Sequence, residues 1–283
     1  MDIGVALPTM IPDVRGHELL DWARKADAGG FSALGVLDRL VYGNDEPLVT
    51  LAAAAAVTER VRLTTSILIA PCRGNTALLA KQAASVHHLS GGRLVLGVAV
   101  GARPDDYAAS GAAFGDRGRR LDGMLADLRG TWAGGEIGPP LPGGGPEILV
   151  GGRAPAALRR AAAHGDGYMG AAGPPRMFAE RAEEVRRLWA EAGRPGRPRM
   201  VAQSYFCLGA GAEENVRAHL GDYYSFAGRL AEMMISGALT APETLRDAVA
   251  GYAAAGCDEL ILIPCSADPG QLELLAAALG EAA

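Results

Sequence analysis

Cysteine is scarce in this chain: Cys72, Cys207, Cys257 and Cys265 lie far apart and form no Cys-x-x-Cys pair. Disulfide frameworks and zinc sites both need cysteines in patterned sets, so this spacing argues against either one. Unpaired, scattered cysteines are typical of a reducing compartment. We therefore expect a cytoplasmic protein, and the heavy use of Ala, Gly, Arg and Pro suggests a bacterial source.

The chain also lacks a net positive charge and long apolar runs. The formal net charge is −5, and Lys and Arg form no cluster of the kind that a phosphate backbone requires. Nucleic acid is therefore not an expected partner. No stretch approaches about 18 apolar residues without glycine or charge, so we expect no membrane span. The first residues contain Asp2 and no basic segment, which argues against a signal peptide.

Several catalytic motifs are absent. The chain has no HExxH, no Cys/His cluster and no GxSxG, so we predict neither a metal site nor a serine hydrolase. The first predicted strand is not followed by GxGxxG, which counts against a dinucleotide-binding Rossmann domain. All the histidines fall on predicted helices, where surface exposure or helix packing is the favoured interpretation. These histidines are His17, His87, His88, His164 and His219.

The most informative stretch that is present runs from Val61 to Arg103. An apolar, β-branched run at 61–69 is followed by a helical pattern at 76–89 and a second apolar run at 94–100. Strand, helix and strand with short connections predict a right-handed parallel βαβ unit. Both apolar runs are continuous, as expected for strands covered on both faces. Their carboxyl ends should lie side by side, and ligands bind at that edge of parallel sheets.

The rest of the chain repeats this alternation of strand and helix. The expected strands are 3–7, 33–37, 61–69, 94–100, 147–150, 168–169, 200–208 and 259–263. The expected helices are 16–28, 48–57, 76–89, 117–132, 154–163, 175–192, 213–223, 242–255 and 271–279. Eight strands, each followed by a helix, predict an α/β fold of the (β/α)8 TIM-barrel type, as a single domain over 1–283. The alternative is an open doubly wound sheet.

Three segments fit no regular element and are expected as loop-rich insertions. They lie near 103–116, 133–146 and 225–240, and the second is a Gly/Pro stretch that cannot be regular structure. The first follows a strand's carboxyl end, so it is placed to cover a site.

The turn Gly151-Gly152-Arg153 directly follows a strand and opens a helix. Bare glycines let a phosphate approach the backbone, and the helix amino terminus supplies unpaired N–H groups and partial positive charge. Arg153 adds a fork of donors. An ordinary strand-to-helix turn, with glycine chosen for positive φ, explains the stretch equally well.

A second candidate site joins Thr65, Ser66 and Ile67 to the segment from Val100 to Arg103. Small residues at two adjacent strand ends make a shelf on which a flat ring can lie. The alternative, a barrel core that narrows to small side chains, is favoured when this stretch is taken by itself. Arg103, Asp105 and Asp38 are weak catalytic candidates, because arginines often only pair with a nearby aspartate. Asp105 and Asp106 are best interpreted as a solvated loop pair.

Taken together, three motifs in this order resemble the bacterial luciferase-like superfamily of flavin-dependent monooxygenases and deazaflavin-dependent oxidoreductases. The motifs are KQAASVHHLSGGRLVLGVAVG, RGRRLDGMLADLR and ILVGGRAPAALRRAAAHGDGYMG, and the resemblance extends to the closing AGCDELILIP. It implies a (β/α)8 barrel with a flavin ring at the carboxyl end. It also implies a bulge at the third strand's end, often with a non-prolyl cis peptide, at Ser66-Ile67 or one residue away.

The resemblance assigns cofactor-binding roles by position. Thr65, Ser66 and Ile67 would back the ring, and Val100 and Gly101 would line the ring or the ribityl chain. The phosphate would be held by Gly151, Gly152 and Arg153, with Tyr168, Met169 and Gly170 nearby. Asp38 matches a cofactor-contacting position in deazaflavin-dependent relatives.

The chain also departs from known branches of that superfamily. Sugar-phosphate dehydrogenases of the deazaflavin branch carry a His and a Glu where this chain has Arg39 and Ala102, so that activity is not expected. Cys72 does not match the reactive cysteine of bacterial luciferases, so light emission is not expected either.

The leading hypothesis is an oxidoreductase that binds reduced FMN from a separate flavin reductase and uses dioxygen to oxygenate a small organic substrate. The alternative is hydride transfer from the deazaflavin coenzyme F420, without dioxygen. A non-catalytic flavin-binding protein and a barrel that binds another phosphorylated metabolite follow in that order. The resemblance suggests a homodimer, with helices around 51–57 and 76–89 as its interface.

Overall fold

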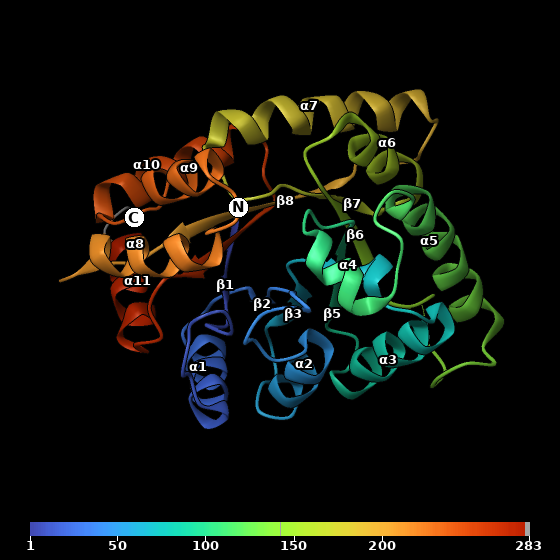
Figure 1. Ribbon diagram of the computed structural model, residues 1–283, viewed down its shortest axis with the longest axis horizontal. Coiled ribbons are helices and arrows are strands. Elements are labelled where there is room, and N and C mark those ends of the chain that lie inside the picture. Colours follow the sequence, from blue (N-terminus) through green and yellow to red (C-terminus); the bar gives the residue numbers. More distant parts are fainter. Residues whose placement is uncertain (142, 281–283) are drawn as a thin grey trace.

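A closed parallel barrel of eight strands, surrounded by helices, forms the protein (Figure 1). The structure is a computed structural model and describes residues 1–141 and 143–280. The eight barrel strands carry nine labels, because β3 and β4 are two pieces of one strand. They are β1 (Asp2–Ala6), β2 (Ala33–Val36), β3 (Arg62–Thr65), β4 (Leu68–Ile69), β5 (Leu94–Ala99), β6 (Glu147–Gly151), β7 (Gly167–Met169), β8 (Arg199–Phe206) and β9 (Glu259–Pro264). All their pairings are parallel, and β1 pairs with both β2 and β9. The predicted (β/α)8 TIM barrel is confirmed.

The third barrel strand is broken into β3 and β4. β3 pairs with β2 on one side and β5 on the other, and β4 continues along β5. Between the two pieces lies a cis peptide bond that joins Ser66 to Ile67. The expected bulge with a non-prolyl cis peptide is therefore present at the first of the positions considered.

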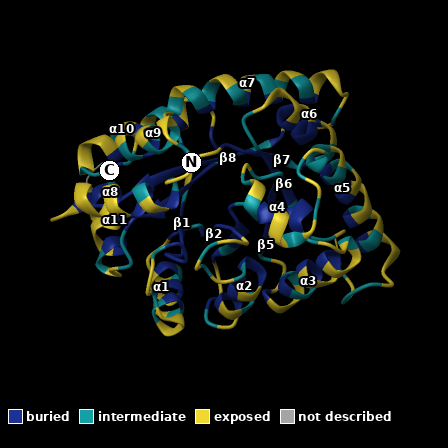
Figure 2. Ribbon diagram, in the orientation of Figure 1, coloured by how far each residue is buried: buried dark blue, intermediate teal, exposed yellow. Residues whose placement is uncertain are grey.

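Helices cover the outside of the barrel. Those of ten residues or more are α1 (Gly16–Ala28), α3 (Thr76–Leu89), α5 (Arg117–Gly134), α6 (Pro155–His164), α7 (Pro175–Glu191), α8 (Ala212–Tyr223), α10 (Pro242–Ala254) and α11 (Gly270–Gly280). A shorter helix, α2 (Pro47–Ala55), follows β2, and a 3-10 turn (Ala70–Cys72) follows β4. Each helix buries one face and exposes the other, whereas the strands are buried except at the starts of β1, β3, β6 and β8 (Figure 2).

The continuous apolar runs of the strands fill two separate layers. In β5, Leu94 and Leu96 pack outward into the layer between strands and helices, whereas Val95 points into the barrel. β9 divides in the same way, with Leu262 outward and Ile263 inward. A strand with both faces buried gains no stability from polar residues on either face, which explains why no alternation is visible in the sequence.

Two of the expected loop segments contain helices. Segment 103–116 holds α4 (Pro104–Ser110), and segment 225–240 holds α9 (Arg229–Ser236). Proline at the first helical position, Asp105 in the first turn and Gly111 in the left-handed conformation after the end are standard helix signals that the expectation overlooked. The described part of 135–146 contains neither helix nor strand.

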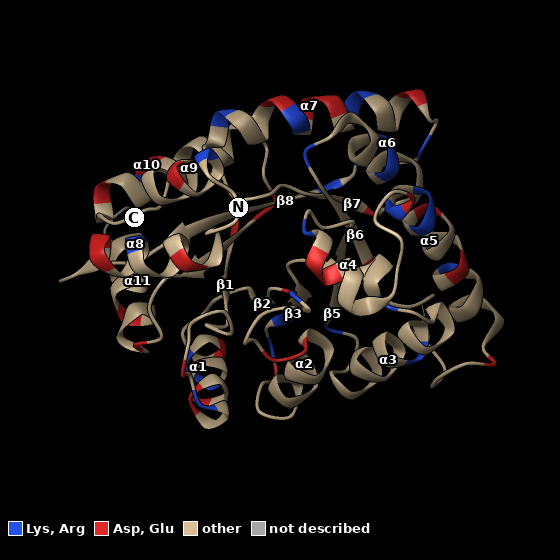
Figure 3. Ribbon diagram, in the orientation of Figure 1, with Lys and Arg blue, Asp and Glu red and all other residues tan. Residues whose placement is uncertain are grey.

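Charged residues lie mainly on the outer helices, and both signs are interspersed along α7 (Figure 3). All four cysteines are buried and free. Within the described ranges, no helix is both long enough and apolar enough to cross a membrane.

Candidate cofactor site

A cavity of about 380 Å³ opens at the carboxyl ends of the strands. Its wall is built from residues that follow β2, β3, β5, β6 and β7, together with residues of β8 and the α8–α9 segment. The predicted site residues in this wall are Asp38, Ser66, Ile67, Val100, Gly101, Arg103, Gly151, Gly152, Arg153 and Met169. The barrel thus brings together most of the residues that the sequence nominated from five separate stretches.

Asp38 braces the bulge of the third strand. Its Oδ2 atom accepts hydrogen bonds from the backbone N–H of Ile69 and from Arg73 Nη2, each at 2.8 Å. Burial raises the pKa of the Asp38 carboxyl, and the nearby Arg73 guanidinium opposes that shift. The carboxylate therefore ties the end of β2 to the segment after the cis peptide, and its charge is committed to Arg73.

Gly151 and Gly152 form the wall opposite the bulge. A Cβ atom on Gly151 would come within 2.3 Å of the Ile67 side chain, so only glycine lets these two parts of the wall approach. Gly152 has a φ of +136°, a conformation that side chains disfavour. Tyr168 donates a hydrogen bond from its hydroxyl to the Gly152 carbonyl at 2.9 Å and fixes the turn from behind.

Arg153 and the first turn of α6 complete a cradle for an anion. The Arg153 Nη2 atom donates to the Ala172 carbonyl at 2.7 Å and has no carboxylate partner within the described chain. The residue that precedes α6, Ala154, offers no side-chain acceptor, and Pro155 opens the helix. The N–H groups of Ala157 and Leu158 bond to the Ala154 carbonyl and Pro155 has none, so Arg153 and the Ala156 N–H are the donors left for an anion. These groups fit the phosphate of a flavin mononucleotide.

The end of β5 supplies the shelf. Val100 accepts a hydrogen bond at its carbonyl from the Tyr107 hydroxyl, and Gly101 adopts the left-handed conformation. Arg103 pairs with Asp105, whose pKa falls to about 2 chiefly because of that hydrogen-bonded guanidinium. Arg103 therefore pairs with a neighbouring aspartate, which was the alternative to a catalytic role. Its side chain still borders the cavity.

The interpretation of Asp105 and Asp106 as a solvated loop pair is wrong for Asp106, which is fully buried. Its Oδ1 accepts from the backbone N–H groups of Leu40 and Val41, and its Oδ2 accepts from Arg39 Nε at 2.8 Å. Because α4 places Asp106 on its inner side, the carboxylate reaches the turn after β2. The pair of Arg39 and Asp106 lines the cavity and was not anticipated.

An aromatic wall from the α8–α9 segment was also missed. It consists of Tyr223, Tyr224 and Phe226, and it lies beside Tyr205 of β8 in the cavity lining. The hydroxyls of Tyr205 and Tyr224 lie 2.9 Å apart, and burial raises the pKa of both, as it does that of Tyr223. Only 5% of the residues are aromatic, so three aromatics within four positions were a usable signal.

Three predicted cofactor residues do not line the cavity. Thr65 is buried and donates from its hydroxyl to the Gly97 carbonyl at 2.7 Å. Tyr168 lies in the core behind Gly152, and Gly170 packs so closely on Phe178 that a Cβ would approach to 2.7 Å. Each supports a wall of the cavity from outside it. Among the residues with described positions, no group of His, Cys, Asp or Glu is arranged to hold a metal ion.

A closed parallel barrel of eight strands with surrounding helices and a cavity at its carboxyl end defines a (β/α)8 protein of the TIM-barrel type. The profile of the luciferase-like monooxygenase family matches residues 1–263. The chain belongs to that family, as the sequence motifs predicted.

Individual relatives resemble the chain in sequence or in fold. The uncharacterized protein Rv0940c of Mycobacterium tuberculosis is 36% identical over 207 residues, which is 61% of this chain and 71% of that protein. The monooxygenase RslO1 from Streptomyces bottropensis superposes with a TM-score of 0.79 at 22% identity, covering 100% of both chains. An F420-dependent secondary alcohol dehydrogenase, solved with an F420-acetone adduct, superposes with a TM-score of 0.81 at 17% identity, covering 98% of this chain and 97% of that one. The two structural likenesses concern the fold.

Proposed function

We propose that this protein is a monooxygenase that binds reduced FMN and uses dioxygen to oxygenate a small organic substrate. The observation that carries the proposal is one cavity that joins a flat shelf to an anion cradle. The shelf lies between the Ser66-Ile67 peptide and Gly101, and the cradle lies at Gly152 and Arg153. A flavin mononucleotide has the same two parts, a planar ring and a phosphate.

Each wall has a defined task in this proposal. Ser66, Ile67 and Val100 hold the ring, and Arg153 with the first turn of α6 holds the phosphate. When bound, reduced FMN supplies the electrons that activate dioxygen, and a separate flavin reductase delivers it. The chain positions the ring, and the aromatic wall of Tyr223, Tyr224 and Phe226 excludes water from it.

The protonation chemistry of the wall favours oxygenation over hydride transfer. Oxidising an alcohol needs a base for its proton, and reducing a carbonyl needs an acid. Both carboxylates of the wall, Asp38 and Asp106, are already bound by arginines and backbone N–H groups. Tyrosines with a raised pKa, such as Tyr223, release protons poorly. Oxygenation by a reduced flavin demands less of these side chains, because the cofactor carries the chemistry.

Hydride transfer with the deazaflavin coenzyme F420 is the alternative, since the family neighbours include an enzyme of that kind. An anaerobic titration with reduced FMN and, separately, with reduced F420 decides between them. We expect micromolar or tighter binding of FMN, weaker binding of F420, and consumption of dioxygen once air is admitted with substrate. Tighter binding of F420, with turnover that needs no dioxygen, would replace the proposal by the alternative. Binding of neither would refute both.

We also propose a homodimer that buries the outer faces of α2 and α3. Val49 of α2 and Leu78 and Leu89 of α3 are large apolar residues with more than half of their surface exposed. Such residues close together are typical of an interaction surface. Light scattering coupled to size-exclusion chromatography should give twice the chain mass of 29.1 kDa. A single-chain mass at micromolar concentration would exclude the dimer.

A further inference from the structure

Arg39 is the one cavity-lining arginine whose side chain is almost completely buried, with 4% of its surface exposed. Two of its three nitrogens are occupied. Nε donates to Asp106 Oδ2 at 2.8 Å, and Nη2 donates to the Val41 carbonyl at 3.1 Å. The third nitrogen, Nη1, has no hydrogen-bond partner among the residues that the structure describes. Six buried guanidinium nitrogens of the described residues lack a partner, and Nη1 of Arg39 is the one that belongs to a cavity-lining residue, where a bound molecule can supply the acceptor.

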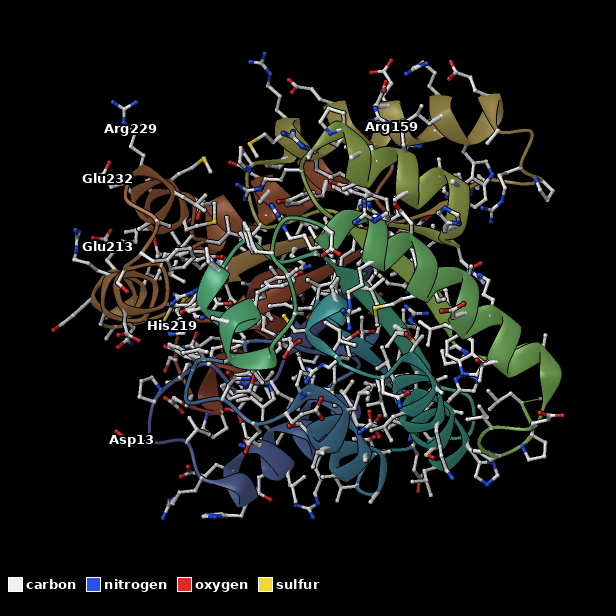
Figure 4. The ribbon with its side chains drawn as sticks, turned by 45° about the vertical axis from the view of Figure 1, so that its right-hand side comes forward. Asp13, Arg159, Glu213, His219, Arg229 and Glu232 are labelled. Atoms are coloured by element: carbon white, nitrogen blue, oxygen red, sulfur yellow. The ribbon has the colours of Figure 1, made fainter. Side chains whose placement is uncertain are left out.

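The surroundings of Arg39 indicate what else the acceptor molecule carries. The guanidinium carbon lies 6.0 Å from the ring centres of Tyr223 and of Phe226, and Arg103 stacks on the same Phe226 ring at 4.1 Å. Phe226 lines the cavity with 48% of its surface exposed, and Leu230 lies beside it in the wall. Figure 4 shows the polar residues Arg229 and Glu232 pointing outward from α9, so the apolar side of that helix is the one turned to the cavity.

From these contacts we infer that Arg39 is a specificity-determining residue for the substrate. Its Nη1 atom donates to an oxygen of a carboxylate or carbonyl group, and the apolar body of the same molecule packs on Phe226 and Leu230. This inference rests on the proposed function, because the substrate shares the cavity with the cofactor ring. The whole cavity is about 380 Å³, near the lower end of the usual range for ligand pockets, and the cofactor ring takes up part of it, so the substrate is small.

The charge balance explains why a donor is available at this point. Asp106 divides its charge among Arg39 and two backbone N–H groups, and the second nearby carboxylate, Asp105, lies 3.7 Å from Nη2 and is hydrogen-bonded to Arg103, so neither carboxylate uses Nη1. An arginine presents five N–H donors in a rigid fork, and a lysine has only one compact ammonium. Lysine at position 39 can therefore keep the pair with Asp106 but cannot also present the second face of the fork.

Three probes of similar size test the inference by calorimetry: benzoate, acetophenone and toluene, with and without oxidised FMN. Benzoate has a carboxylate, acetophenone a carbonyl, and toluene no acceptor. We expect one of the first two to bind at least about tenfold more tightly than toluene, as for one hydrogen bond to a charged group. Preference for benzoate identifies a carboxylate substrate, and preference for acetophenone identifies a carbonyl.

Arg39→Lys should abolish this preference while FMN affinity stays unchanged. The matched control is Arg160→Lys, because Arg160 is a buried arginine in α6 whose Nε pairs with Asp122 and whose Nη2 donates to the Gly118 carbonyl. That variant should keep the preference.

Equal binding of all three probes to the native protein, including no binding, would overturn the inference, and so would a preference that survives in Arg39→Lys. Failure of FMN to bind would instead remove the proposed function. If Arg39→Lys melts far below Arg160→Lys, the probe series on the native protein still decides.

Discussion

The two ends of the barrel both bury arginine–carboxylate pairs, but they use them differently. At the amino end, the first residues of five strands form a connected network. Its members are Asp2, Arg62, Glu147, Arg199 and Glu259. Glu259 is 1% exposed, and each of its oxygens accepts from an arginine, at 2.6 Å from Arg62 and 2.7 Å from Arg199. Each arginine of this network therefore pairs with carboxylates of the same network.

At the carboxyl end, the arginine–carboxylate pairs lie on the rim of a cavity. They join fewer residues to one another than the network at the amino end does. Asp38 is bound to Arg73, Asp106 to Arg39 and Asp105 to Arg103. Arg153 has only a backbone carbonyl. The difference teaches that burial of charge alone does not mark a site. Within the described chain, both ends leave a buried guanidinium nitrogen without a partner, Arg62 Nε at the amino end and Arg39 Nη1 at the carboxyl end, but of these two arginines only Arg39 lines a cavity.

The largest expected effect comes from breaking the amino-end network. Glu259→Gln leaves Arg62 and Arg199 without their shared buried partner, and we expect the free energy of unfolding to fall by about 3–5 kcal/mol. Urea denaturation measures this loss. The affinity for FMN should not change in the folded protein, because the cavity lies at the other end. A large loss of FMN affinity with little loss of stability would show instead that the amino-end network serves cofactor binding and not stability.

Acid should loosen the wall at the carboxyl end. His219 of α8, labelled in Figure 4, is buried against Tyr223, and burial lowers its pKa from 6.5 to about 4. Below pH 6.5 the unfolded chain takes up a proton that the folded chain refuses, so stability falls as the pH drops from 6.5 to 4. The loss is roughly 3 kcal/mol and is absent above pH 6.5.

His219→Gln should remove that part of the pH dependence, and His17→Gln, at an exposed position of α1, should not. Urea denaturation at several pH values between 7 and 4 compares the three proteins. An unchanged slope in His219→Gln would show that His219 is not the group responsible.

A smaller effect is expected at the anion cradle. Arg153→Met removes the charge without shortening the side chain greatly, and FMN affinity should fall about 10- to 100-fold, as for one charge-assisted hydrogen bond. Arg159→Met is the matched control, because Arg159 lies on the exposed side of α6 and away from the cavity (Figure 4). Fluorescence titration with FMN measures both. Equal losses in the two variants would mean only that general positive charge matters.

The smallest effect should come from the rim. Phe226→Leu keeps an apolar side chain but removes the ring on which Arg103 stacks, and about 0.5–1 kcal/mol of stability should be lost. FMN affinity should be unchanged, since Phe226 belongs to the proposed substrate side. Thermal melting and FMN titration on the same preparation check the two statements. A loss as large as that of Glu259→Gln would show that the rim is as tightly integrated as the amino end.

Sequence patterns predicted the fold well because periodicity and turn residues are local. The strand–helix alternation and the glycine turn at Gly151 follow from short stretches of sequence and were found where expected. The bulge at Ser66 was implied by the family resemblance and was also found where expected. Helix α3 was also predicted with its observed bounds. However, Leu78 and Leu89, which contributed to its apolar pattern, are exposed, because a pattern shows that a face is apolar and not what covers it.

The parts of the site that were missed depend on distant contacts. Asp106 looked like a loop residue, because the groups that donate to its carboxylate, at Arg39, Leu40 and Val41, lie more than sixty positions away. Phe226 approaches the cavity only because α9 folds back over the strand ends. Local propensity carries no information on such pairings, so only the folded chain can reveal them.

The most direct test of the central claim is a crystal structure of the protein with FMN bound. The account predicts the ring against the Ser66-Ile67 peptide and the phosphate in contact with Arg153 at the start of α6. The neighbouring Arg39 Nη1 should remain available on the substrate side. A flavin bound elsewhere, or with its phosphate turned away from Arg153, would contradict the assignment of this cavity as the cofactor site.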